Sequence, residues 1–321
     1  MLHGRIGFAV LVAAGATSAF GAADECDRAC LKGLLDQYLG AVIRHDPAAA
    51  PLSAGFRQTE NAVVVRTGTG VWKSVTALGK AQRRYLDPVS GQAGYFGTVE
   101  EQSESAIVTV RVRVERRKIS EAEWIMARKG NPGLNGFTAT GQPSGNFFEP
   151  ENLAANPPPD KILLKAARSS REAMIAATNS YFDGITTHDG SIILAHQGCM
   201  RVENGRTVTG RTGPDGKARA AATDCTSNLE NINVQLVAAR RYPLVDEETG
   251  VVLGLAVFVR KPGTTTRRNM LSEWFVIEDN KVRSIYSSMF YPSPEAPVPN
   301  WPPYEGNWPL PATLAPAPGI R

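Results

Sequence analysis

The sequence predicts an α+β fold built from two tandem copies of one domain. The first observation is an internal repeat, in which five identical residues recur 143 positions further along the chain. The recurring pairs are Tyr38 and Tyr181, His45 and His188, Asp46 and Asp189, Glu60 and Glu203, and Asn61 and Asn204. The second observation is that each copy opens with a helical pattern and closes with alternating strands. A chain of 321 residues is long enough for two such domains.

The first 23 residues are typical of a secretory signal peptide. Arg5 is their only charged side chain, and it precedes the apolar stretch IGFAVLVAAGATSAF, which is followed by small residues suited to cleavage. The alternative is an uncleaved N-terminal anchor, although a spanning helix usually needs about 20 apolar residues. No later stretch could cross a membrane. We therefore expect a secreted or periplasmic protein whose mature chain has no membrane span.

Composition and motifs exclude several classes of partner. The chain has 35 basic and 31 acidic residues, a formal net charge of +4, and no long run of like charges, which argues against nucleic acid. It contains no phosphate-binding loop and no dinucleotide fingerprint, and its four histidines lack a metal-binding spacing. We therefore expect no metal and no cofactor.

The four cysteines are Cys26, Cys30, Cys199 and Cys225. In an exported protein an even number of cysteines favours disulfides, with three pairings open. Cys26 and Cys30 lie one helical turn apart, within bridging distance, which favours the pairs 26–30 and 199–225. A zinc site made from all four is the alternative, but only the first pair has a short metal-binding spacing.

The first domain is expected over residues 24–128. Its helix, CLKGLLDQYLGAVI, has apolar residues on one face and is followed by His-Asp, a short helical stretch and a strand that ends near Glu60. A long hairpin, AIVTVRVRVERRKISEAEWIMA, turns at ERRK.

The second domain is expected over residues 168–291. Its helix, SREAMIAATNSYFDGI, begins at a predicted capping box formed by Ser169 and Glu172. Its last hairpin, NMLSEWFVIEDNKVRSIYSSMF, lies 163 residues after the corresponding one, so the second copy has about 20 extra residues. We assign these to RRYPLVDEETGVVLGLAVFVRKPG, which forms a further hairpin turning at DEETG.

Two segments without periodicity complete the chain. Residues 129–167 are predicted to be a linker, and residues 292–321 a Pro-rich tail. The tail carries Trp301, Tyr304 and Trp308, which are unusual in a solvated segment. Part of the tail is therefore expected to pack on a domain surface, with a flexible tail as the alternative.

Both copies resemble the SnoaL-like and ketosteroid-isomerase-like members of the nuclear transport factor 2 superfamily. The resemblance is carried by YLGAVIRHDPAAAPL and by a Tyr eight residues before an Asp in each copy, over residues 26–128 and 168–291. It implies two cone-shaped α+β barrels, each a curved antiparallel sheet wrapped on helices. The motifs TEN, GVWK, CMRVENG and FYPSP are further similar to a secreted fungal and bacterial family of unknown function, which implies no activity.

The resemblance implies a catalytic site in the second copy. In ketosteroid isomerases a helix Tyr donates a hydrogen bond to the substrate oxyanion, a carboxylate is the base, and a second acid assists the Tyr. These positions correspond to Tyr181, Glu203 and Glu273. The base is Glu rather than Asp and lies 14 residues after the Asp, two fewer than in the family. We expect His188 to be an auxiliary acid.

The first copy would hold a degenerate or second pocket. Its matching residues are Tyr38, His45 and Glu60, but Val110 stands where the second acid would be. An oxyanion site in this copy would therefore lack one donor.

Each of these residues also has a structural interpretation. Asp46 and Asp189 are most simply N-caps. The two histidines could shuttle protons or could bind a carbonyl at a helix end. The two Tyr residues could simply pack, and the two Glu residues could lie in an apolar interior or at a solvated rim. Arg57 and Arg201 precede the Glu residues, and such a pairing would favour a charged carboxylate.

Two functions follow from this pattern. The first is an exported, cofactor-independent lyase or isomerase for a small apolar or carbonyl-bearing molecule, working by dehydratase-like proton abstraction. The alternative is a non-catalytic secreted binding protein for a small apolar ligand or a partner protein, because one scaffold serves both uses. The sequence leaves the oligomeric state open, with a homo-oligomer among the options.

Overall fold

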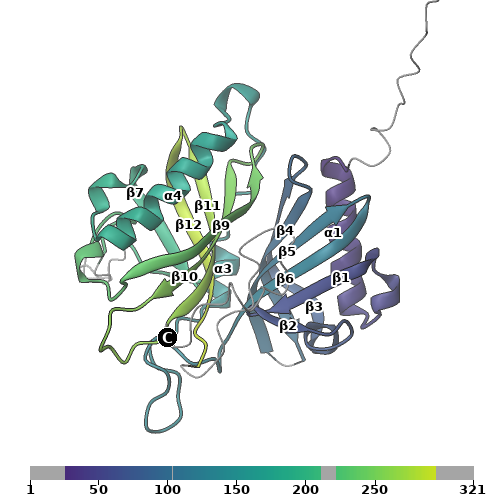
Figure 1. Cartoon of the computed structure of the whole chain (residues 1–321), viewed down its shortest axis with the longest axis horizontal. Helices are drawn as coiled ribbons and strands as arrows, with labels where there is room; N and C mark the ends of the chain where they lie inside the picture. Colours follow the sequence, from purple (N-terminus) through teal and green to yellow (C-terminus); the bar gives the residue numbers. More distant parts are fainter. Residues whose placement is uncertain (1–25, 103, 211–221, 294–321) are drawn as a thin grey trace, which may run out of the picture.

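Each repeat folds into its own six-stranded sheet with one long helix (Figure 1). The computed structural model describes residues 26–102, 104–210 and 222–293. The predicted signal peptide and the aromatic residues Trp301, Tyr304 and Trp308 of the tail lie outside these ranges. Within them, no helix has the length and apolar character needed to span a membrane.

The first sheet has the strand order β2-β1-β6-β5-β4-β3. The elements of this domain are α1 (Arg28–Ile43), η1 (Pro47–Ala49), β1 (Leu52–Glu60), β2 (Val63–Val65), α2 (Val71–Ser74), β3 (Val75–Asp87), β4 (Gln92–Glu101), β5 (Glu104–Glu115) and β6 (Lys118–Arg128).

The second sheet has the same order in its own strands, β8-β7-β12-β11-β10-β9. Its elements are α4 (Arg171–Thr187), η3 (Gly190–Ile192), β7 (Ala195–Glu203), β8 (Arg206–Thr207), η4 (Leu229–Asn231), β9 (Leu236–Asp246), β10 (Val251–Val259), β11 (Asn269–Glu278) and β12 (Lys281–Phe290). The internal repeat is therefore a duplication of the whole scaffold.

The sheets are mixed and open, which corrects the expectation of antiparallel barrels. The last strand of each hairpin meander pairs in parallel with the strand that follows the long helix, β6 with β1 and β12 with β7. The edge strands do not pair with each other in either sheet. Alternation of side chains gives the faces of a strand but not the direction of its neighbour, so the sequence pattern could not reveal this pairing.

The β9–β10 hairpin is not an insertion, as the sequence had suggested. The first domain has the equivalent hairpin, β3–β4, which aligns at Asp87 with Asp246 and at Gly91 with Gly250. Its first strand, VTALGKAQRRYLD, does not alternate cleanly, and the prediction missed it. Most of the extra residues instead lie between β8 and β9, in the segment that contains Cys225, and a few lie between β10 and β11.

The helix starts follow local hydrogen bonding. Asp27 caps α1 by accepting from the backbone N of Cys30, at 2.8 Å. The predicted cap at Ser169 is wrong by one residue, because Ser170 caps α4. The Ser169 hydroxyl instead accepts from the backbone N of Asn280 in the β11–β12 turn, which ties the start of the helix to the sheet.

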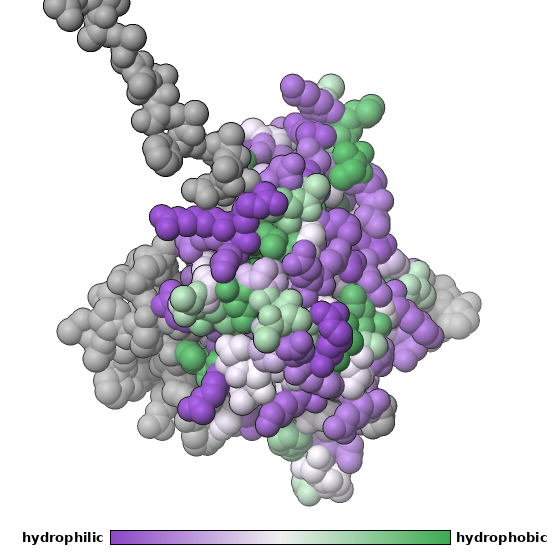
Figure 2. Space-filling view, turned by 90° about the vertical axis from the view of Figure 1, so that its right-hand side faces the viewer, coloured by the Kyte–Doolittle hydropathy of each residue, from purple (hydrophilic) through white to green (hydrophobic). Residues whose placement is uncertain are grey.

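The two sheets pack back to back, with α1 and α4 on the outer faces (Figure 1). The core between the sheets is rich in aromatic residues, and the rings of Tyr85 and Trp274 lie 4.8 Å apart. Figure 2 views the molecule from the side on which the first domain lies, and apolar residues there are scattered among hydrophilic ones. Most of the largest apolar side chains are buried, either in the core of one domain or in the core between the two sheets.

A local two-fold axis relates the domains. The Ser272 hydroxyl bonds to Thr109 at 2.7 Å, and the Ser288 hydroxyl donates to the carbonyl of Ile125 at 2.8 Å. In both pairs the partners are 163 residues apart, which is the offset between the last hairpins of the two repeats. Equivalent positions therefore face each other, as in an isologous dimer.

The same symmetry produces a reciprocal pair of ionic contacts at the two helix starts. Arg28 of α1 makes a bidentate contact with the buried Asp246, at 2.6 and 3.0 Å. Arg171 of α4 makes the matching contact with the buried Asp87, at 3.0 and 2.7 Å. The long helix of each domain therefore binds the turn of the β3–β4 or β9–β10 hairpin in the other domain.

The predicted linker packs against both domains. It contains α3 (Pro150–Ala155), whose Leu153 is fully buried in the core between the sheets. Its backbone donates from Glu149 to the carbonyl of Asn204 and from Leu163 to that of Glu248. The connection is therefore part of the interface between the domains.

Candidate active site in the second domain

Three neighbouring strands place polar side chains in one row. Glu273 of β11 lies opposite Ser287 of β12, which lies opposite Glu203 of β7. Partners in register point to the same face of a sheet. That face is the one covered by α4, because Phe275 and Ile285, at alternate positions along the same strands, belong to the core under this helix.

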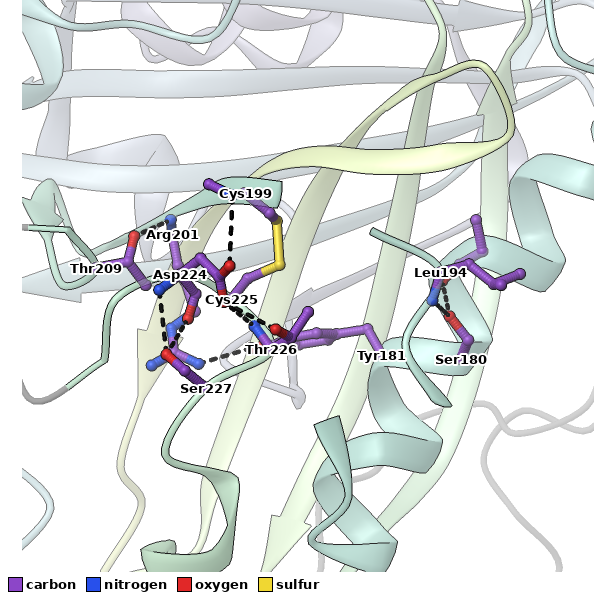
Figure 3. The surroundings of a disulfide bond; sticks show 12 residues. Ser180, Tyr181, Leu194, Cys199, Arg201, Thr209, Asp224, Cys225, Thr226 and Ser227 are labelled. Atoms are coloured by element: carbon purple, nitrogen blue, oxygen red, sulfur yellow. Dashed lines mark hydrogen bonds between the residues drawn. A yellow bond between two sulfur atoms is a disulfide. The ribbon is translucent and has the colours of Figure 1, made fainter. Parts of the chain in front are cut away.

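Tyr181 of α4 joins the row through Arg201. The Nη1 of Arg201 donates to the Tyr181 hydroxyl at 3.1 Å, and its Nε lies 2.9 Å from Oε1 of Glu203, as an ion pair without hydrogen-bond geometry. Figure 3 shows Tyr181 and Arg201 beside the Cys199–Cys225 disulfide. Among the described residues, Tyr181 makes only this hydrogen bond, so its own proton is available to donate.

Glu273 is the unusual group of the site. The residue is 3% exposed, and its Oε2 has no hydrogen-bond partner within the described part of the chain. Burial, together with the nearby charge of Glu203, raises the pKa of Glu273 to about 8, although Arg201 opposes this shift. The carboxyl group is therefore mostly protonated at neutral pH and can donate a hydrogen bond.

The first domain fills the same place with a closed network. The Tyr38 hydroxyl donates to Gln58 at 2.9 Å and accepts from the indole of Trp124 at 2.9 Å, while Trp72 also donates to Gln58 at 2.8 Å. Gln58 occupies the register of Arg201, and Trp124 that of Ser287. The Tyr38 hydroxyl thus has both a donor and an acceptor and keeps no free proton for a ligand.

Glu60 has a structural role. It accepts from the backbone N of Val71 at 2.9 Å, at the start of α2, and from Gln58 at 3.1 Å. Burial raises the pKa of Glu60, while these hydrogen bonds oppose the shift. The first domain therefore uses its Glu to hold a helix start.

The two histidines lie at helix ends. Nδ1 of His45 is 2.8 Å from the carbonyl of Trp72, and Nδ1 of His188 is 3.0 Å from that of Leu229. Both residues have positive φ, 57° and 60°, where the helix terminates. Asp46 and Asp189 cap the short helices that follow, as predicted. The His-Asp repeat thus marks a turn that both domains share.

Both predicted disulfides are present. Cys26 pairs with Cys30 and Cys199 with Cys225, so no thiol is left for the alternative zinc site. In the described ranges, no group of three His, Cys, Asp or Glu side chains could hold a metal ion.

A hollow of about 440 Å³ lies on the first domain, between β1 and the β5–β6 hairpin. Its lining is polar and consists of Ser53, Gly55, Arg57, Arg113, Glu115, Ser120 and Glu121. None of the predicted catalytic residues reaches it.

Residues 167–289 match a family model described as a domain of unknown function, DUF8021. The search of curated proteins found no match. The family match covers the second repeat, including Tyr181, Arg201, Glu203 and Glu273, and supports the resemblance to a family of unknown function. The relationship to SnoaL-like proteins stays a prediction. The function therefore has to be inferred from the chemistry of the site.

Proposed function

We propose that the second domain is a cofactor-independent lyase or isomerase for small carbonyl-bearing molecules. The observation that carries the proposal is the buried carboxyl group of Glu273, whose Oε2 has no hydrogen-bond partner among the described residues, near a Tyr hydroxyl with a free proton and a second carboxylate. Burial raises the pKa of Glu273 to about 8, which favours its protonated form. Two neutral donors and one carboxylate on a shared apolar face are the groups needed for proton abstraction beside a carbonyl.

In this mechanism Glu203 is the base. Its carboxylate removes a proton from the carbon next to the substrate carbonyl, and the electrons of that C–H bond form a C=C bond as the carbonyl oxygen becomes an oxyanion. Tyr181 and Glu273 donate hydrogen bonds to this oxygen, and Arg201 holds both Tyr181 and Glu203 in position. An isomerase returns the proton to another carbon, whereas a lyase expels a leaving group from the neighbouring carbon. His188, bound to a backbone carbonyl, is not required.

One observation favours the alternative, a secreted binding protein. Glu203 is engaged by Arg201, and a carboxylate held in an ion pair is less free to approach a substrate proton. The same residues would then orient a bound ligand without reacting with it.

Proton exchange separates the two functions without knowledge of the substrate. A panel of simple ketones in D₂O is followed by NMR for exchange of the protons next to the carbonyl. We expect the mature chain to catalyse exchange, Glu203→Gln to abolish it, and Glu60→Gln, the matched change in the first domain, to retain most of it. Binding of 2-naphthol, a phenol that mimics the oxyanion, without exchange of any ketone would support the binding protein.

We also propose that the protein is exported and cleaved near residue 23. Two disulfides fit an oxidising compartment. The intact mass of the exported protein should correspond to the cleaved chain and should rise by four hydrogens on reduction. A mass that includes residues 1–23 would indicate the uncleaved anchor.

A further inference from the structure

An ion pair joins β4 and β6 near one end of the first sheet. Arg128, at the end of β6, binds Glu101 of β4 at 2.5 and 2.8 Å, and Ser74 donates to the same carboxylate. The charges of the partly exposed Arg128 and Glu101 side chains are thus paired with each other.

The register of the strands identifies the equivalent positions in the second domain. In the first sheet Val99 lies opposite Ala106, which lies opposite Arg128. In the second sheet Phe258 lies opposite Asn269, and Met270 opposite Phe290, which puts Tyr291 next to Asn269. Counting two residues on from Val99 and from Phe258 places Arg260 where the first domain has Glu101. The second domain therefore has Arg260 in place of Glu101 and Tyr291 in place of Arg128.

Arg260 faces the candidate site. Side chains alternate along β10, and Ala256 and Phe258 belong to the core under α4, so Arg260 continues that face. Its Nη2 donates to Oδ1 of Asn269 at 2.7 Å, and its Nε to the carbonyl of Arg267 at 2.9 Å. These bonds fix the plane of the guanidinium group.

No carboxylate of the described residues forms an ion pair with Arg260. Both of its acceptors are neutral, and Glu203 is already paired with Arg201. Burial lowers the pKa of Arg260, and the nearby Tyr291 and Glu203 only partly offset this effect. Arg201 is paired with Glu203, whereas Arg260 has only neutral acceptors among the described residues, so its positive charge is available to a ligand.

We propose that Arg260 binds a carboxylate of the ligand, so that the second domain takes a carbonyl compound that also carries one carboxylate. The inference rests on the proposed function, because it places the reacting carbonyl at Tyr181 and Glu273. A planar guanidinium with free N–H groups matches a carboxylate in shape, and one negative charge balances the site.

Two fluorescent probes that differ by one carboxylate test the proposal on the mature chain. They are 2-naphthol and 6-hydroxy-2-naphthoate, titrated at pH 7. We expect the naphthoate to bind roughly 10- to 100-fold more tightly, the range for a charge-assisted contact. Arg260→Gln should remove this preference, so that the two probes bind with similar affinity. An unchanged preference in this variant would overturn the proposal.

Two further variants sharpen the test. Arg283→Gln removes one positive charge from an exposed ion pair with Glu278, and we expect it to keep the preference, which excludes a general effect of net charge. Arg260→Glu with Tyr291→Arg transplants the ion pair of the first domain, and we expect it to reject the naphthoate while remaining folded.

The outcomes separate this inference from the proposed function. If both probes bind the wild-type protein equally, the role of Arg260 is wrong while the oxyanion site stands. If neither probe binds, both proposals fail. If the naphthoate is preferred but no ketone exchanges its protons, the carboxylate site belongs to a binding protein.

Discussion

Glu273 couples the stability of the second domain to pH. Its pKa of about 8 lies above the usual 4.5, so the folded state binds more protons than the unfolded state between these values. The stabilising contribution is complete below the unfolded pKa and is lost as pH rises through 8. We expect the free energy of unfolding to fall by a few kcal/mol between pH 5 and pH 9, and Glu273→Gln to remove most of this slope. Urea denaturation at several pH values measures it.

The control for this prediction is Glu172→Gln, which removes an exposed carboxylate at the start of α4. It should leave the pH dependence as in the wild type. Parallel curves for the wild type and Glu273→Gln would show that Glu273 is charged in the folded protein, and would remove it as a donor.

The two Tyr residues offer a matched pair of changes. Tyr38→Phe leaves the buried indole N–H of Trp124 without an acceptor, which should cost about 1–3 kcal/mol of stability and leave exchange unchanged. Tyr181→Phe removes an oxyanion donor, so we expect exchange to slow by roughly 10²- to 10³-fold in a folded protein. Thermal unfolding and the ketone assay separate the two effects, and equal losses of exchange in both variants would contradict the assignment.

The residues that are identical in the two repeats mark the shared scaffold of the site, whereas the residues that differ determine its chemistry. Tyr, His, Asp and Glu recur, and most of them cap helices or pack. The positions that separate the domains are Gln58 against Arg201, Trp124 against Ser287, and Glu101 against Arg260. The first two pairs lie at the offsets of 143 and 163 that the sequence shows, but the pair Glu101 and Arg260 becomes visible only when strand register aligns the two sheets, because the offset there is 159.

At the level of elements, the Cys199–Cys225 disulfide holds the extra segment of the second domain over β7. The backbone N of Cys225 also donates to the carbonyl of Cys199, two residues before Arg201. Closing a loop of this length contributes about 3 kcal/mol on the loop-entropy model. We expect Cys199→Ala with Cys225→Ala to lower stability by about this amount and to weaken naphthol binding.

The matched change is Cys26→Ala with Cys30→Ala, which opens a loop of only a few residues at the start of α1. Its cost should be smaller, and naphthol binding should not change. Equal losses of binding in the two double variants, measured by the same titration, would mean that the disulfides act only through overall stability.

The helices and the last hairpins could be predicted because their apolar periodicity is strong. The parallel pairing of β1 with β6 could not, because it depends on a contact between distant strands and leaves no trace in local alternation. β3 was missed because its register shifts between Val75 and Ala77 and again between Leu78 and Gln82, and such irregularities break the period of two.

At the scale of the whole molecule, the two-fold arrangement makes each domain the partner of the other. The core between the sheets buries Tyr85 and Phe96 of the first domain and Trp274 and Tyr286 of the second. Separated domains would expose these aromatic surfaces. Two separate domains joined by a loose linker would give two independent fragments on cutting near Gly136. The packed linker and the shared core now predict that the fragments stay associated.

The interface is also expected to favour pairing of a first domain with a second domain over a homodimer of second domains. Arg241 of the second domain bonds to the buried Glu123, which also binds Arg111 at 2.8 Å. The position equivalent to Glu123 in the second sheet is Tyr286, so a homodimer of second domains would bury Arg241 without a carboxylate. We expect co-expressed fragments 24–128 and 129–291 to form a 1:1 complex by native mass spectrometry, and Glu123→Gln to weaken it. A prevailing homodimer of the second fragment would show that the aromatic core, rather than this charge cluster, decides the pairing.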